Sequence, residues 1–91
     1  MKRIEGRKGV IGTIIVNEDG IPIRTSMDNT TTVLYATSLR KICYLATSTI
    51  RDLNPRNDLS FVRVRTKKDE IIIAPDNGYL LIVIQSIVKN Q

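Results

Sequence analysis

The sequence has no histidine, no tryptophan and a single cysteine among its 91 residues. Histidine is the side chain that most often moves protons near neutral pH and binds metal ions, so the commonest catalytic and metal-binding group is missing. One cysteine cannot form a disulfide within the chain, which is typical of proteins in a reducing compartment. We therefore expect a cytoplasmic protein that is not an enzyme and that holds no metal or other cofactor.

The remaining groups that could carry chemistry are isolated from one another. Cys43 falls among the apolar positions of an expected helix, where a small core residue is expected rather than a nucleophile. The carboxylates fall mostly in turns and caps, where aspartate is favoured for backbone reasons; they are Glu18, Asp19, Asp28, Asp52, Asp58, Asp69, Glu70 and Asp76. Gly9-Val10-Ile11-Gly12 is too sparse for a phosphate-binding loop and opens a strand rather than a helix. These absences favour a binding module.

Long apolar runs and aromatic residues are scarce as well. The longest unbroken apolar run, Leu80–Ile84, is far shorter than the roughly 20 residues that a membrane span needs. Met1-Lys2-Arg3 is followed by Ile4-Glu5-Gly6, so no secretory signal is expected. One Phe and three Tyr provide few platforms for stacking bases. We expect no membrane insertion and no nucleic-acid partner, although the net charge of +5 keeps a basic nucleic-acid-binding domain as an alternative.

The chain does contain one strong helical pattern, from Thr30 to Leu53. Read at about 100° per residue, its apolar residues fall on one face; they are Tyr35, Ala36, Leu39, Ile42, Cys43, Ala46, Ile50 and Leu53. Asp28-Asn29 can cap the free N–H groups at the start, before a polar first turn at Thr30-Thr31-Thr32. Asn54-Pro55 ends the helix because proline has no N–H to donate. No other stretch can form a helix of this length, so the rest of the chain must pack against it.

Isoleucine and valine supply 21 of the 91 residues, a bias that favours sheet. Alternation and turn signals predict five strands; they span Gly9–Asn17, Ile21–Met27, Leu59–Thr66, Glu70–Ala74 and Tyr79–Gln85. The first, fourth and fifth are apolar on both faces and belong in the middle, whereas Pro22 and the arginines of the third strand indicate edges. We predict a single α+β domain over residues 1–91, with a five-stranded antiparallel sheet in the order 2-1-5-4-3 and one long helix on one face.

This arrangement leaves the second face of the sheet apolar and uncovered. One helix covers one face, and only Met1–Lys8 and Ile87–Gln91 remain for the other. Apolar patches beyond a few hundred Å² usually mark a binding surface. We expect another chain to supply the cover. The alternative is that the two short ends fold over this face and suffice.

Two further features point to protein partners. Leu34 and Leu45 share one side of the helix, with Ser38 and Lys41 between them. Two copies of the helix can meet there beside an edge strand, or the leucines are ordinary surface apolarity. The basic residues form two blocks, Lys2, Arg3, Arg7 and Lys8 in one and Arg63, Arg65, Lys67 and Lys68 in the other. They can steer the chain to an acidic protein segment, or they simply keep an edge strand solvated.

A further group of motifs runs from about Lys8 to Gln85. They are Gly20-Ile21-Pro22-Ile23, Asp28-Asn29 with Thr31-Thr32, Ser48-Thr49-Ile50-Arg51-Asp52, Pro55, Asn57-Asp58-Leu59, Phe61, Arg63, Arg65, Lys67-Lys68, Glu70-Ile71, Ala74-Pro75-Asp76 and Leu81-Ile82-Val83-Ile84-Gln85. In combination they resemble the roadblock-type dynein light chains. The resemblance implies a profilin-like roadblock sandwich and a non-catalytic subunit of cytoplasmic or axonemal dynein, associated with microtubules in the cytoplasm or in a cilium.

The resemblance also implies how such a protein assembles. Family members form homodimers by joining edge strands into a ten-stranded sheet with the helices side by side; a heterodimer with a paralogous light chain is a variant. The dimer then binds a segment of the dynein intermediate chain and supports cargo attachment. The implied dimer interface comprises Leu34, Ser38, Lys41, Leu45, Phe61, Val62, Arg63, Val64 and Arg65, and the implied partner-binding residues are Ile4, Val10, Arg63, Lys67 and Lys68.

Two departures from the family pattern weaken the link to the intermediate chain. The long first helix of the family is cut here to Met1–Lys8, a short or truncated helix or arm that contains Gly6, and a mid-helix glycine costs roughly 1 kcal/mol relative to alanine. The helix centre, Arg40–Tyr44, and the tail, Ser86–Gln91, also differ. Roadblock-like domains also assemble on small GTPases, so a module that regulates or scaffolds a small GTPase is the alternative within the fold.

Overall fold

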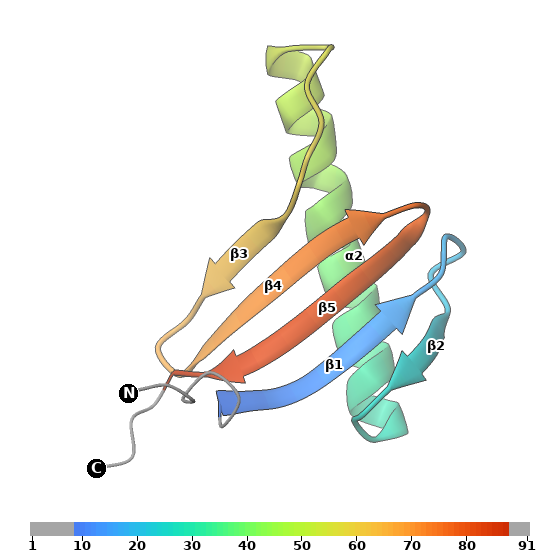
Figure 1. The fold of residues 1–91 in the computed structure, drawn as a ribbon, viewed down its shortest axis with the longest axis vertical. Coiled ribbons are helices and arrows are strands. Elements are labelled where there is room, and N and C mark those ends of the chain that lie inside the picture. Colours follow the sequence, from blue (N-terminus) through green and yellow to red (C-terminus); the bar gives the residue numbers. More distant parts are fainter. Residues whose placement is uncertain (1–8, 88–91) are drawn as a thin grey trace.

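One antiparallel sheet and one long helix make up the part of the chain that the structure, a computed structural model, describes: residues 9–87. The strands lie in the order β2-β1-β5-β4-β3, with the helix α2 across one face (Figure 1). The elements are β1 (Val10–Val16), β2 (Pro22–Thr25), α2 (Asn29–Leu53), β3 (Val62–Arg65), β4 (Asp69–Asp76) and β5 (Tyr79–Ser86). The predicted fold class and strand order are confirmed. The expectation for residues 1–8 lies outside the described residues.

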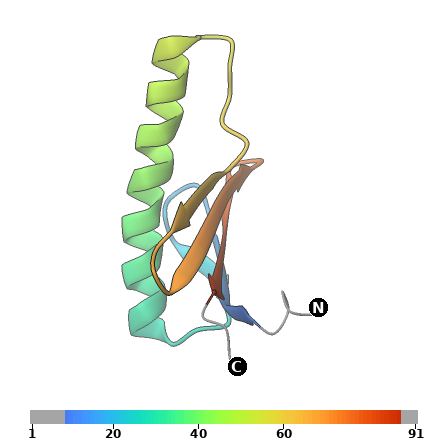
Figure 2. The same cartoon turned by 90° about the vertical axis from the view of Figure 1, so that its left-hand side faces the viewer.

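The central strands are apolar on both faces, as the sequence predicts. On the helix side, Ile14 and Ile73 have no exposed surface and form the core together with residues of β5 and α2. Their chain neighbours Ile15 and Ile72 project from the opposite face, because alternate residues of a strand point to opposite sides. β2 and β3, with four residues each, form the edges. The sheet therefore has two aliphatic faces, of which α2 covers one (Figure 2).

The ends of α2 are held by the residues that the sequence indicates. The Asp28 carboxylate accepts the Thr31 N–H at 3.3 Å, and the Asn54 N–H donates to the Ile50 carbonyl at 3.0 Å. At about 1.5 Å per residue, 25 residues extend about 37 Å, whereas the longest strands extend roughly 25 Å. The C-terminal half of α2 therefore rises past the sheet (Figure 1).

This overhang changes which helix residues are buried. The apolar pattern assigns Ile42 and Leu53 to the core stripe, but both are exposed, Leu53 by 78%. Leu53 is the last residue of α2, whose C-terminal end lies beyond the sheet (Figure 1), and Ile42 is 37% exposed. Conversely, the expected polar first turn includes Thr32, which is only 1% exposed and whose hydroxyl hydrogen bonds the Thr25 hydroxyl at 2.8 Å. The assignments of Ile42 and Leu53 to the core stripe were wrong, and Leu53 was misplaced because periodicity does not reveal how far the sheet reaches.

β4 runs two residues further than predicted, through Pro75 to Asp76. Asn77 and Gly78 have positive φ, 51° and 86°, and form a two-residue turn that joins β4 directly to β5. Because Asp76 pairs with Tyr79 next to this turn, the backbone nitrogen of Pro75 points away from β5. β3 pairs only with the part of β4 that precedes Pro75. The missing N–H of the proline therefore leaves no ladder hydrogen bond unmade.

Candidate functional site

The first candidate surface is the outer edge of β3, a strand that pairs only with β4 within the described chain. Phe61, just before the strand, is exposed, and its ring centre lies 5.9 Å from the guanidinium carbon of Arg63. Arg63 also lies 3.5 Å from the carboxylate of Glu70 on β4. The two valines of β3 are half-buried on the helix side, whereas Arg65 is exposed. The backbone of this edge is open to pairing with another strand.

The second candidate surface is the side of α2 that faces away from the sheet. Leu34 and Leu45 are 61% and 62% exposed there, and Ser38 and Lys41 between them are exposed too. The chain that follows α2 returns to β3 (Figure 1). Ile42 extends the apolar side toward the helix flank. Sequence reasoning missed it because it placed Ile42 in the core.

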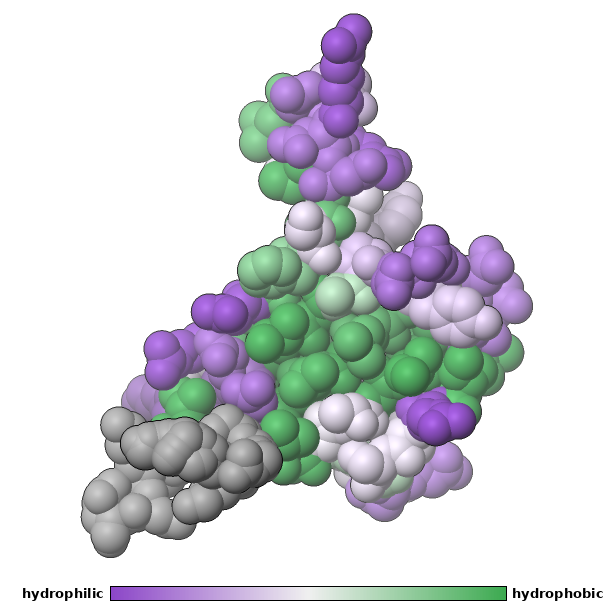
Figure 3. Space-filling view, viewed as in Figure 1, coloured by the Kyte–Doolittle hydropathy of each residue, from purple (hydrophilic) through white to green (hydrophobic). Residues whose placement is uncertain are grey.

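The third candidate surface is the sheet face opposite α2, called the open face below. Paired side chains cross it in three rows: Arg24–Ile15–Leu81–Ala74, then Thr13–Val83–Ile72–Arg63, then Val10–Gln85–Glu70–Arg65. Leu81 is 41% exposed, and Figure 3 shows an apolar surface over the middle strands with hydrophilic side chains toward the edges. Within residues 10–87, no helix lies on this face (Figure 2). The open face is aliphatic in the middle and carries arginines at both edges.

The residues predicted to bind a partner fall on and beside the open face. Val10 and Arg63 both project from it, on β1 and on β3. Lys67 and Lys68 are exposed in the turn between β3 and β4, at one end of the face. Ile4 lies outside the described residues. Their role in binding stays a prediction, but the structure brings the four described residues to one region.

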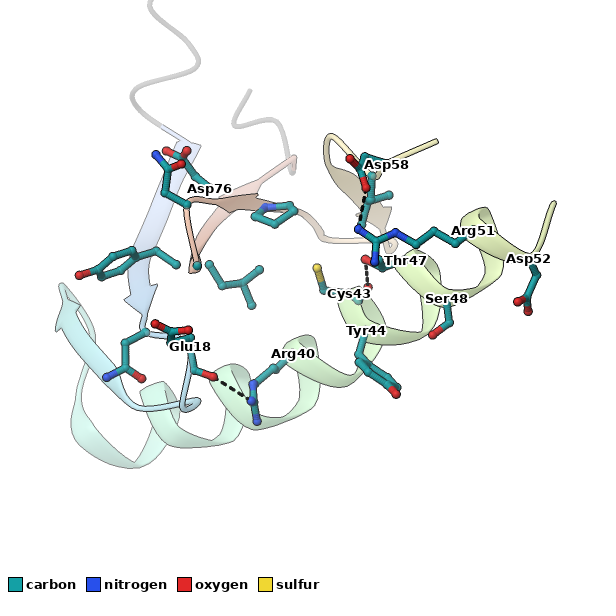
Figure 4. A pocket seen from close by; sticks show the side chains of 17 residues that line it. Glu18, Arg40, Cys43, Tyr44, Thr47, Ser48, Arg51, Asp52, Asp58 and Asp76 are labelled. Carbon is teal, nitrogen blue, oxygen red and sulfur yellow. Dashed lines mark hydrogen bonds and ion pairs between the residues drawn. The ribbon is translucent and has the colours of Figure 1, made fainter. Parts of the chain in front are cut away.

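A groove of about 830 Å³ lies between the overhanging part of α2 and the turns that join β1 to β2 and β4 to β5 (Figure 4). Arg40 crosses it and donates to the carbonyl oxygen of Glu18 at 3.2 Å. Arg51 donates to the carboxylate of Asp58 at 2.6 Å. Both guanidinium groups are thus engaged with the chain itself. The sequence gives no signal for this groove because it depends on the overhang of α2.

The chemistry of this groove is limited. The thiol of Cys43 points into it (Figure 4), and burial raises the pKa of the thiol despite a hydrogen bond from Thr47, which lowers its reactivity as a nucleophile. Nowhere in residues 9–87 do three or more cysteine, aspartate or glutamate side chains gather closely enough to bind a metal ion. In the same range, α2 is not apolar enough to cross a membrane.

Comparison with known proteins places these surfaces in context. The family model described as the Roadblock/LC7 domain matches residues 1–86. Among solved structures, the chain is similar to the Roadblock/LC7 domain from Streptomyces avermitilis, with a TM-score of 0.79 and 15% identity over 86% of this chain and 67% of that chain. It is also similar to Myxococcus xanthus MglB, with a TM-score of 0.69 and 17% identity over 86% of this chain and 65% of that chain. The chain thus spans about two thirds of the length of each, and the likeness is one of fold.

Proposed function

Because the chain belongs to the Roadblock/LC7 domain family, we propose that it is a non-catalytic homodimeric module that scaffolds or regulates a small GTPase. The observation that carries the proposal is the open face, an aliphatic surface with arginine edges that no helix in residues 10–87 covers. A surface of this kind is suited to holding another protein rather than to transforming a substrate.

Two considerations support a GTPase over the dynein intermediate chain as the partner. Roadblock-like domains assemble on small GTPases as well as in dynein. The two similar structures come from bacteria, whereas dynein is a motor of eukaryotic cells. The hypothesis of a dynein light chain, located at microtubules or in a cilium, is still supported by the sequence motifs between Gly20 and Gln85. The aliphatic rows that interrupt the basic edges of the open face disfavour nucleic acid as a partner.

The proposed homodimer uses the first two surfaces. The β3 edges of two copies pair across a two-fold axis, while Leu34 and Leu45 of one copy pack against the same residues of the other. The exposure of both leucines and the open outer edge of β3 support this arrangement. Pairing through β3 joins the two sheets, so that the open faces become one continuous surface for a partner.

Calorimetry against candidate partners tests the GTPase role. The purified chain is titrated with each small GTPase of its source organism, loaded with GDP or with a GTP analogue, and with a synthetic segment of a dynein intermediate chain. We expect at least one GTPase to bind, with an affinity that depends on its nucleotide. Lys67→Glu should weaken binding, whereas Arg56→Glu, an equal charge change at an exposed site beyond α2, should not. Binding of the intermediate-chain segment with no GTPase bound would refute the GTPase role and favour dynein.

A further inference from the structure

We propose that the open face docks an amphipathic α-helix of a partner protein, and that the flanks of this helix are acidic. The inference rests on the proposed scaffolding role and names the chemistry of the segment that the scaffold holds. Three features of the described residues carry it: the likeness of the two faces of the sheet, the dimensions of the aliphatic strip and the arginines at its edges.

The centre of the open face resembles the face that α2 already covers. Ile14 and Ile73 lie under α2 with no exposed surface. Ile15 and Ile72 are their neighbours along β1 and β4 and carry the same side chains to the open face. Leu81, in the centre of the open face, stays 41% exposed. The centre of the sheet is thus aliphatic on both faces, and among the described residues a helix covers only one of them.

The dimensions of the aliphatic strip match a helix. It spans the three central strands β1, β5 and β4, and strands lie about 4.8 Å apart, so the outer two are separated by about 10 Å. This is close to the diameter of an α-helix with its side chains. Along β5, the open-face residues from Tyr79 to Gln85 extend about 20 Å, which corresponds to roughly 13 helical residues. Leu81 and Val83 form the aliphatic middle of this length, between Tyr79 and Gln85. A helix of three to four turns therefore spans the face, with its apolar contacts in the middle turns.

The charges at the rim define the flanks of the occupant. Arg24 lies at the β2 edge of the first row, and Arg65 lies at the β3 edge of the third. Neither arginine has an ion-pair partner within residues 9–87. Glu70, the carboxylate of the third row, pairs with Arg63 instead. A helix along the strip therefore meets an unpaired arginine on each side. Acidic residues on both flanks of its apolar stripe complement them.

A second copy of the chain and a membrane surface are the other possible occupants. Stacking two open faces places the arginines of one rim against those of the other, which is repulsive. An anionic membrane matches the charge, but Ile15, Ile72 and Val83 are half-buried in the sheet. Bilayer contact favours apolar groups that protrude, whereas a docked helix can bring its own side chains down to the sheet.

Titration of the full chain with a designed peptide tests the proposal. The probe is a stapled helical peptide of about 18 residues, with a leucine stripe flanked on both sides by glutamate and a fluorophore for anisotropy. A control peptide has lysine in place of every glutamate. We expect the glutamate peptide to bind at least about tenfold more tightly than the lysine peptide, with the difference shrinking at high salt.

Matched variants locate the peptide on the molecule. Leu81→Lys should weaken binding at least about tenfold because it places a charge in the centre of the strip, whereas Leu53→Lys, at the exposed end of α2 and outside the proposed dimer contact, should leave it unchanged. Arg24→Glu should weaken binding about three- to tenfold, and Arg56→Glu, the same charge change outside the face, should not. Circular dichroism confirms that each variant is folded. Arg24→Glu is a surface change, so it tests the proposal even if Leu81→Lys does not fold.

Each of the other outcomes overturns the proposal. Equal binding of both peptides removes the role of the arginines. Binding of phosphatidylserine vesicles without peptide binding, abolished by Leu81→Lys, makes the face a membrane surface. A fall in molar mass caused by Leu81→Lys makes it a contact between copies. The GTPase titration is a separate test. If the peptide binds and no GTPase binds, the open face is a helix-docking surface and the proposed GTPase role is wrong.

Discussion

At the scale of single residues, Gly20 lets the β1–β2 turn lie against α2. Its φ is +85°, and a Cβ added there lies 2.8 Å from a guanidinium nitrogen of Arg40. That guanidinium ties the turn to the helix through the Glu18 carbonyl. We expect Gly20→Ala to lower the free energy of unfolding by about 1–2 kcal/mol for the left-handed backbone, and by about 0.5–1 kcal/mol more for the displaced Arg40 bond. Chemical denaturation measures the loss.

Gly78 provides a comparison that separates the cost of the left-handed backbone from the cost of the displaced Arg40 hydrogen bond. Its φ is +86°, but an added Cβ comes no closer than 3.7 Å to the Glu18 side chain. Gly78→Ala should therefore show the backbone cost alone. In an Arg40→Ala background, Gly20→Ala should lower the free energy of unfolding by the same amount as Gly78→Ala, because the hydrogen bond from Arg40 to the Glu18 carbonyl is already absent. If Gly20→Ala lowers the free energy of unfolding equally with and without Arg40, the hydrogen bond between Arg40 and the β1–β2 turn contributes nothing to stability.

At the scale of elements, the start of α2 depends on one carboxylate. Hydrogen bonds from the Thr31 hydroxyl and then from the Thr31 N–H hold the pKa of Asp28 below its ordinary value of 3.8. A lowered folded-state pKa gives stability that is present above the unfolded-state pKa and is lost as the pH falls through the folded one. The thermal midpoint of the wild type should therefore exceed that of Asp28→Asn at neutral pH, and the difference should vanish on going from about pH 4 to about pH 2.

Asp28→Asn is an informative comparison because asparagine keeps an oxygen that can accept the Thr31 N–H but has no titrating group. Every other carboxylate is the same in the two proteins, so their difference isolates position 28. A difference in thermal midpoint that persists unchanged at pH 2 would show that the charge of Asp28 does not stabilise α2.

The elements were predictable from the sequence, but their relative lengths were not. The unbroken apolar run Ile71-Ile72-Ile73 predicts a strand that is apolar on both faces, and this gave the strand order. Leu53 satisfies the helical period equally well whether or not a sheet lies beneath it, so the overhang and the groove beside it were missed. Pro75 was taken as the end of a strand because the short reach of β3 is visible only in the folded chain.

For the candidate surfaces as well, some features were predictable from the sequence and others required the structure. The exposure of Leu34 and Leu45 follows from helical periodicity, and an uncovered sheet face follows from two-sided strands and a single helix. The placement of Arg24 and Arg65 at opposite rims requires the pairing register, because a slip of one residue turns a side chain to the other face. Sequence pattern therefore identified an apolar face without showing what charge its occupant carries.

At the scale of the whole molecule, the surfaces proposed for the dimer and for the partner do not compete. The dimer uses the outer edge of β3 and the outward side of α2, whereas the partner uses the open face on the other side of the sheet (Figure 2). Pairing through β3 brings the Arg63 and Arg65 residues of two copies near the two-fold axis. In the proposed dimer the centre of the joined surface would therefore be its most basic part, which would favour an acidic partner.

Leu45→Glu tests the dimer on which this arrangement depends. Leu45 is 62% exposed in one subunit, so the change should leave the unfolding free energy of the monomer within about 0.5 kcal/mol. In a two-fold dimer it brings two carboxylates together at the helix contact, which should weaken association at least about tenfold. Light scattering should show the molar mass falling from twice 10.3 kDa toward 10.3 kDa, while Tyr44→Glu, on another side of α2, leaves it unchanged. A dimer that both substitutions leave intact has its interface elsewhere, and a wild-type chain that is already monomeric at micromolar concentration excludes pairing through β3.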